Sequence, residues 1–180
     1  MKWIKKEILK GKVKKSSQKK KERKNHFNIN YTEAKKIGIL FSIKELEDLN
    51  KLKFYQEKLK KEDKEVSFIT FFEKKKNPSI PFECTILSYE DISLRGKIKS
   101  DKGKKIISTS FDYLLYIGNT ISPIMAIILD QSNAECRIGI FNEKLTHLFE
   151  LMLIKEKDKS IELFLEQLTH YLTKIKNEEK

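Results

Sequence analysis

The sequence predicts an α/β fold, a three-layer sandwich around a mostly parallel, Rossmann-like sheet, and three observations support this prediction. Short apolar runs alternate with amphipathic stretches through residues 31–180. The first run, the first amphipathic stretch and the second run form a strand-helix-strand unit, which implies parallel strands joined by a right-handed crossover. A chain of 180 residues is long enough for one domain with its own core and is short for two.

The first half of the domain contributes two strands and a helix. The run KIGILFS contains Gly38, which is typical of a buried strand with a close neighbour, and it predicts a strand over residues 37–41. Leucines then recur every three or four residues, as on one face of a helix, over residues 44–60. The run VSFITFF predicts the second strand, over residues 67–71.

The middle of the chain is less regular. Two prolines mark a loop at residues 77–83, and residues 84–89 predict a short third strand. Residues 91–110 hold two glycines and many lysines, and they predict a loop with one short helix.

The second half returns to the alternating pattern. Strands are predicted over residues 113–116 and 137–140, and the helix between them, residues 122–133, begins with Ser122 as N-cap and Pro123 at its first position. This helix carries few charges, so we expect it to be buried on more than one side. Residues 148–154 suit either a helix or a strand, and we favour a strand because a separate amphipathic helix follows at residues 161–174.

Most of the net charge lies in a basic N-terminal arm, residues 1–30. Residues 1–24 contain twelve Lys/Arg and two Asp/Glu, a net charge of +10, whereas the rest of the chain contains 26 basic and 24 acidic residues, a net charge of +2. This asymmetry argues against a nucleic-acid-binding face within the domain at residues 31–180 and for a separable arm. We therefore expect residues 1–24 to contribute almost nothing to the apolar core, so that their deletion leaves the domain folded.

Three interpretations of the arm are open. It is a solvated tail, or it neutralises the phosphates of RNA or a ribosome, or it lies on an anionic membrane surface. An amphipathic segment with Trp3, Ile4, Ile8 and Leu9 favours the membrane. The following basic run has no apolar partner and favours RNA, and its candidate contacts are Lys19, Lys20, Lys21, Arg23 and Lys24.

The sequence offers no catalytic constellation. It has no glycine-rich dinucleotide fingerprint, no P-loop and no nucleophile elbow, and its three histidines are far apart without metal-type spacing. We therefore predict no catalytic residue, no metal and no cofactor. Cys84 and Cys136 fall within predicted strands and are read as core thiols of a cytoplasmic protein, with attachment to the inner membrane as the alternative location.

The best candidate for a ligand site is the turn after the strand at residues 113–116. Ligands of open α/β sheets bind beyond the carboxyl ends of the strands, and the N-terminus of a helix suits a phosphate. The candidate residues are Gly118, Asn119, Thr120 and Ser122, with Ser42 after the first strand as a weaker candidate at the same end. The alternative is a turn without a ligand, in which Ser122 only caps the helix.

Two resemblances accompany this reading. The segment SPIMAIILDQSNAECRIGIFN is similar to the nucleotide-sugar-binding segment of heptosyltransferase-type glycosyltransferases, although that family's histidine is absent and Met125 and Ala126 occupy its place. The stretches AKKIGILF, FDYLLYIGN, CRIGIF and FELMLI resemble an uncharacterised family of small bacterial proteins, a domain of unknown function. That second resemblance implies an α/β fold and no activity.

These observations favour a non-enzymatic binding protein that associates with RNA or a ribonucleoprotein through the arm. The alternative is a binder or transferase of a phosphorylated small molecule or nucleotide-sugar at residues 118–122. A third hypothesis is peripheral attachment to a membrane through the N-terminal amphipathic segment.

Overall fold

A computed structural model describes Leu9 and residues 30–42, 49–72, 79–118, 120–155 and 160–174. Within these ranges, short strands alternate with helices along the chain. The strands are β1 (Lys36–Phe41), β2 (Glu65–Phe71), β3 (Thr85–Leu87), β4 (Tyr113–Ile117), β5 (Cys136–Ile140) and β6 (Leu151–Leu153). The α-helices are α2 (Leu49–Lys61), α3 (Asp101–Ser108), α4 (Pro123–Gln131) and α5 (Ile161–Lys174), and two 3-10 helices are η1 (Tyr89–Asp91) and η2 (Glu143–Leu148).

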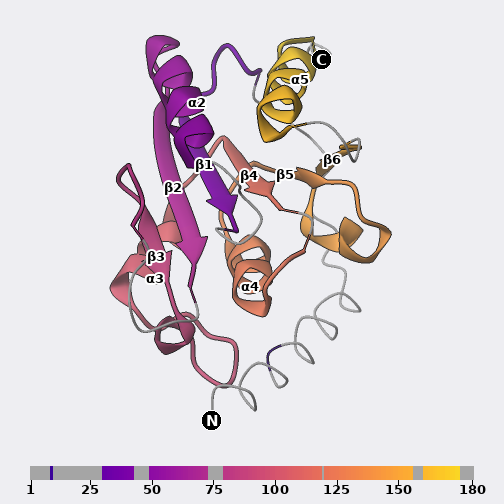
Figure 1. The fold of residues 1–180 in the computed structure, drawn as a ribbon. Coiled ribbons are helices and arrows are strands. Elements are labelled where there is room, and N and C mark those ends of the chain that lie inside the picture. Colours follow the sequence, from indigo (N-terminus) through magenta and orange to yellow (C-terminus); the bar gives the residue numbers. More distant parts are fainter. Residues whose placement is uncertain are drawn as a thin grey trace.

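The strands form one sheet in the order β3-β2-β1-β4-β5-β6, and every neighbouring pair is parallel. The chain starts in the middle of the sheet, builds outward to β3, and then crosses back to β4 on the other side of β1 (Figure 1). This is the doubly wound, Rossmann-like arrangement, and its strand order reverses between β1 and β4. The predicted α/β fold is confirmed.

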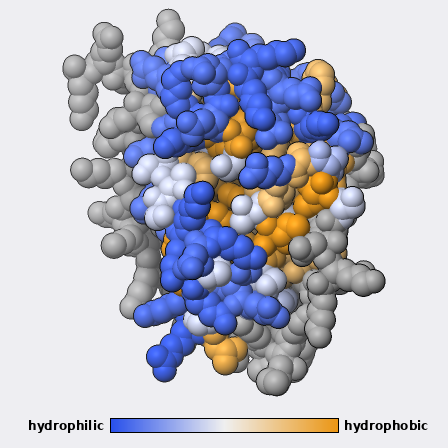
Figure 2. Space-filling view, turned by 90° about the vertical axis from the view of Figure 1, so that its left-hand side faces the viewer, coloured by the Kyte–Doolittle hydropathy of each residue, from blue (hydrophilic) through white to orange (hydrophobic). Residues whose placement is uncertain are grey.

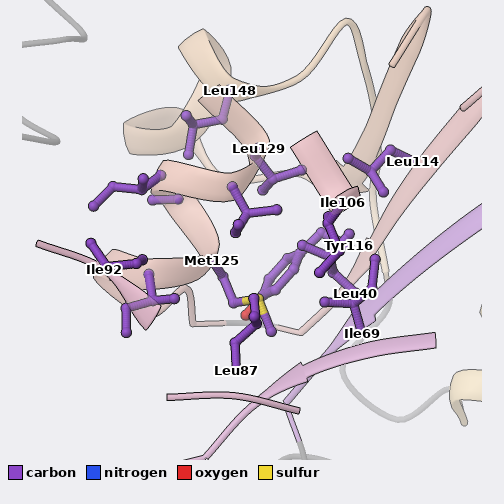
Figure 3. Packing of buried hydrophobic residues seen from close by; sticks show 14 of the residues in the cluster. Leu40, Ile69, Leu87, Ile92, Ile106, Leu114, Tyr116, Met125, Leu129 and Leu148 are labelled. Carbon is purple, nitrogen blue, oxygen red and sulfur yellow. The ribbon is translucent and has the colours of Figure 1, made fainter. Parts of the chain in front are cut away.

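Helices cover both faces of the sheet, because alternate residues of each buried strand point to opposite sides. On one face, side chains of α2 and α5 pack against β1, β2, β4 and β5. On the other face, side chains of α3, α4 and η2 pack against the sheet, and Figure 3 shows Met125 and Leu129 of α4 among residues such as Leu40, Ile69 and Tyr116 from the strands. Helix α4 is apolar almost throughout because it is buried from Pro123 to Leu129.

Most predicted elements match the observed ones. The predicted strands at 37–41, 67–71, 113–116 and 137–140 and the helix at 161–174 are confirmed. The helix predicted at 44–60 is confirmed from Leu49, and residues 44–48 lie outside the described part. The strand predicted at 148–154 is shorter than expected, because its first residues belong to η2 and Phe149 turns inward to the core.

Leu9 corrects the expectation that residues 1–24 contribute almost nothing to the core. Its backbone is helical, its side chain is completely buried, and it belongs to the apolar cluster on the α3 and α4 face. An apolar residue at helical spacing was expected to face solvent or a membrane. Here the apolar side chains of α3 and α4 provide a surface against which it packs.

Tyr31, the first residue after the arm, packs on the opposite face of the sheet. Tyr31 belongs to the cluster beneath α2 and α5, and its hydroxyl donates to Glu62 at 2.8 Å. The buried amine of Lys64 lies 4.3 Å from the centre of the Tyr31 ring and donates to the carbonyls of Tyr31 and Ala34 at 2.7 and 2.9 Å. The basic segment between Leu9 and Tyr31 is therefore attached to the domain at both ends.

Candidate functional site

The predicted ligand turn lies at the point where the strand order reverses. Phe41 of β1 pairs with Ile117 of β4, so Ser42 and Gly118 are the next residues on two adjacent, parallel strands. The sequence placed both residues at carboxyl ends of strands, and the strand order makes those ends neighbours. This is the position at which Rossmann-like sheets bind their ligands.

The turn itself is closed by its own residues. The hydroxyl of Tyr116, a buried residue of β4, donates a hydrogen bond to the carbonyl of Thr120. The Tyr116 ring also lies 6.4 Å from the ring of Phe149, centre to centre. Gly118 is half-buried and Thr120 is exposed, whereas Asn119 lies outside the described residues.

Ser122 caps helix α4. Its hydroxyl oxygen accepts a hydrogen bond from the backbone N–H of Met125 at 3.2 Å, and its carbonyl accepts one from the N–H of Ala126 at 3.0 Å. Pro123 occupies the first turn, where its missing N–H costs no hydrogen bond. The interpretation of Ser122 as an N-cap is therefore confirmed, and its hydroxyl oxygen already has a partner.

The neighbouring end of β1 is also held by a hydrogen bond within the protein. Ser42 is half-buried, and the carbonyl of Phe41 before it accepts a hydrogen bond from the hydroxyl of buried Thr70 at 2.8 Å. This bond ties the ends of β1 and β2 together. Residues 43–48, which follow Ser42, lie outside the described part.

A buried ion pair joins β5 to the start of β6. The guanidinium of Arg137 contacts the carboxylate of Glu150 through Nη2 and through Nε, the latter at 2.9 Å from Oε2. Its Nη1 donates to the carbonyl of Leu129 at 2.9 Å, in the last turn of α4, where a cation is favoured by the helix dipole. Because its donors are used within the protein, we assign this pair a structural function.

Of the two histidines that the structure describes, His147 is half-buried and His170 is exposed. The Nε2 of His147 is buried and has no hydrogen-bond partner among the described residues. Burial lowers the pKa of His147, the positive charge of Arg137 lowers it further, and the negative charge of Asp130 opposes both.

The described residues contain no group of three or more His, Cys, Asp or Glu side chains placed to hold a metal ion. Cys136 is buried and Cys84 is half-buried just before β3, and neither forms a disulfide. Burial raises the pKa of both thiols, that of Cys84 to about 12, which makes them poor nucleophiles.

The structure also contains a cationic surface that the overall charge count concealed. The stretch of residues 91–105 contains six Lys/Arg and two Asp/Glu, although the domain as a whole is nearly neutral. The six basic residues are all exposed on the loop before α3 and on α3 itself: Arg95, Lys97, Lys99, Lys102, Lys104 and Lys105. A charge count over short windows would have found this stretch, whereas a count over the whole domain hides it.

The predicted nucleic-acid contacts Lys19, Lys20, Lys21, Arg23 and Lys24 lie outside the described residues. Of the predicted membrane-facing residues, Leu9 is described and is buried within the domain. In the part of the chain that the structure describes, no helix has the length and apolarity needed to cross a bilayer.

Comparison with known proteins gives one informative result. A family model described as a family of unknown function (DUF6913) matches residues 5–175, which includes most of the basic arm. No curated protein and no solved structure is significantly similar to the chain. The resemblance to an uncharacterised family is confirmed, whereas the similarity of residues 122–142 to glycosyltransferases is not shown.

Proposed function

The chain belongs to the DUF6913 family of unknown function, and from that premise we propose that it is a non-enzymatic protein that binds RNA through its basic N-terminal segment. The observation that carries the proposal is the net charge of +10 on residues 1–24 against +2 on the rest of the chain. Clustered lysines that neutralise phosphates release condensed counterions, which gives strong, salt-dependent binding without a folded pocket.

Two structural observations support this proposal over its rivals. In the turn at residues 118–122, the carbonyl of Thr120 accepts a hydrogen bond from Tyr116 and the hydroxyl oxygen of Ser122 caps α4, so these two polar groups already have partners. The burial of Leu9 removes one of the four apolar residues that a membrane-bound helix would present to lipid. Two free cysteines also suit a reducing cytoplasm, where RNA is the abundant polyanion.

The test is RNA binding by the full chain, measured by fluorescence anisotropy with a labelled single-stranded oligouridylate. Affinity should fall steeply with salt, with a log–log slope of roughly −4 if about six lysines contact phosphates. Replacing Lys19, Lys20, Lys21, Arg23 and Lys24 with Gln should remove most of the affinity, and Trp3→Ala should have little effect.

A matched control removes the same charge elsewhere, from five exposed lysines on the body: Lys53, Lys58, Lys60, Lys61 and Lys144. This variant should retain most of the affinity and the salt slope. Equal losses in both variants would mean that only net charge matters. RNA binding that survives the replacement in the arm would refute the proposal. Binding to anionic vesicles that weakens with Trp3→Ala would favour the membrane instead.

The strand order supports a second candidate function, the binding of a phosphorylated small molecule or nucleotide-sugar at the reversal point. Ser42 and Gly118 lie side by side there, as ligand-contacting residues do in Rossmann-like sheets. Thermal denaturation with nucleotides and nucleotide-sugars tests it. A rise in melting temperature that Ser42→Ala reduces would support the site, and no shift at millimolar ligand would count against it.

A further inference from the structure

The segment from the loop before α3 to the end of α3 presents cations on a rigid support. Asp91, which is buried, accepts hydrogen bonds from the backbone N–H of Ser88 at 2.6 Å and from its hydroxyl at 3.1 Å. A bridge between Ile92 and Ile98 closes the loop, and the side-chain amide of Gln131 in α4 donates to the carbonyl of Gly96 at 2.9 Å. Ordering this surface for a ligand would therefore cost little conformational entropy.

Some of its basic side chains have structural partners and some do not. The amine of Lys102 donates to the carbonyl of Ile86 at 2.6 Å and lies 3.3 Å from the carboxylate of Asp91, and Lys104 pairs with Asp101 at 3.2 Å. Arg95 also interacts within the chain. Among the described residues, Lys97, Lys99 and Lys105 are exposed and their amines have no acidic partner.

This surface lies on the same side of the sheet as the attachment point of the basic arm. Ile92, Ile98 and Ile106 of the segment pack in the cluster that also buries Leu9. Figure 2 looks onto the side of the molecule that carries β3 and α3, and it shows hydrophilic side chains on the left of its lower half, beside hydrophobic side chains to their right. The 15 residues from Leu9 to Lys24 span roughly 50 Å when extended, enough to reach α3.

We infer that Lys97, Lys99 and Lys105 form a second contact surface for the RNA backbone, next to the attachment point of the arm. This inference rests on the proposed RNA binding and names where the folded domain takes part in it. Besides the cations, the described surface here exposes only one large apolar residue, Leu94, and no aromatic ring on which a base could stack. The surface therefore contacts phosphates and does not select a sequence.

The test compares the full chain with a triple variant, Lys97→Gln, Lys99→Gln and Lys105→Gln, in the same anisotropy assay. All three side chains are exposed, so the variant should keep its circular dichroism spectrum and melting temperature. If each amine contacts one phosphate, the log–log salt slope should become shallower by about 2, at about 0.7 per contact. Oligouridylate and a mixed-sequence RNA should bind equally well.

The matched control replaces Lys53, Lys58 and Lys60 of α2 with Gln, which removes the same charge from the opposite face of the sheet. It should leave the slope unchanged. RNA binding by the parent chain with the same slope in both triple variants would overturn the second surface and leave the proposed function intact. A parent chain that binds no RNA would overturn both.

Discussion

At the scale of single residues, Arg137 and His147 show that the charge of a buried side chain depends on its hydrogen-bond partners. Arg137 is almost fully buried, and its guanidinium bonds to Glu150 and to the carbonyl of Leu129. His147 is half-buried, and its Nε2 has no partner in the described residues. The first arrangement stabilises a charge inside the protein, and the second favours the neutral form of the side chain.

His147 should make the stability of the protein sensitive to mild acid. Its pKa is lowered in the folded state, mainly by burial, so the unfolded chain binds the proton more readily. The stabilising effect is therefore complete above the ordinary pKa of 6.5 and is lost as the pH falls through the lower, folded-state pKa. The melting temperature of His147→Gln should fall less than that of the parent between pH 7 and pH 5. His170→Gln, at an exposed position, should follow the parent, and identical curves for all three proteins would contradict this account.

Breaking the Arg137–Glu150 pair from one side should be costly. Glu150→Ala leaves a buried guanidinium without its carboxylate, which typically costs about 3–5 kcal/mol in the free energy of unfolding. The double variant Arg137→Met with Glu150→Leu should recover much of that loss, because it leaves no buried charge. Urea denaturation of the parent, Arg137→Met, Glu150→Leu and the double variant measures the coupling, and additive losses would show that the two side chains act independently.

At the scale of elements, two strands contain glycines because a side chain from elsewhere occupies the space of the missing Cβ. A Cβ built on Gly139 in β5 would lie 2.7 Å from the ring of Phe149. A Cβ on Gly38 in β1 would lie 2.5 Å from a methyl group of Leu114. The sequence indicated close approach at Gly38, and the packing identifies the neighbour in each case.

Gly139→Ala should therefore destabilise the sheet even though alanine suits a strand better than glycine does. The ring of Phe149 is buried and cannot easily move away, so overpacking should cost about 1–3 kcal/mol in the free energy of unfolding. Adding Phe149→Leu should relieve part of the cost. If Gly139→Ala alone left the urea midpoint unchanged, the contact between β5 and Phe149 would be looser than described.

At the scale of the whole molecule, described residues on either side of the basic segment pack into the core. Leu9 is buried on the α3 and α4 face, and Tyr31 is buried on the α2 and α5 face. The family match extends from residue 5, which agrees with a segment that is part of the domain.

Leu9→Ala should consequently lower the free energy of unfolding by about 2–5 kcal/mol, the usual range for a fully buried leucine. Leu94→Ala is the matched control, because Leu94 is 54% exposed and its truncation should change little. Deleting residues 1–24 should destabilise the domain at least as much as Leu9→Ala. A deletion variant as stable as the parent in urea denaturation would restore the original expectation of a separable arm.

The sequence by itself determined the elements and the class of the fold. Apolar periodicity located β1, β2, β4, β5 and α5, and the Ser122-Pro123 pair located the start of α4, because these signals depend on residues close together in the chain. Strand-helix-strand spacing then required parallel pairing. The sequence also located the candidate turns at Ser42 and Gly118, since each follows a predicted strand.

Only the tertiary structure decided which distant segments of the chain are neighbours. Strand order made Ser42 and Gly118 neighbours, and the hydrogen bond from Tyr116 to Thr120 showed that the turn is closed. Burial of Leu9 likewise depends on contacts between segments far apart in sequence. A helical pattern specifies an apolar face but not the surface that covers it, because burial is non-directional and any apolar layer within reach of the chain can satisfy it.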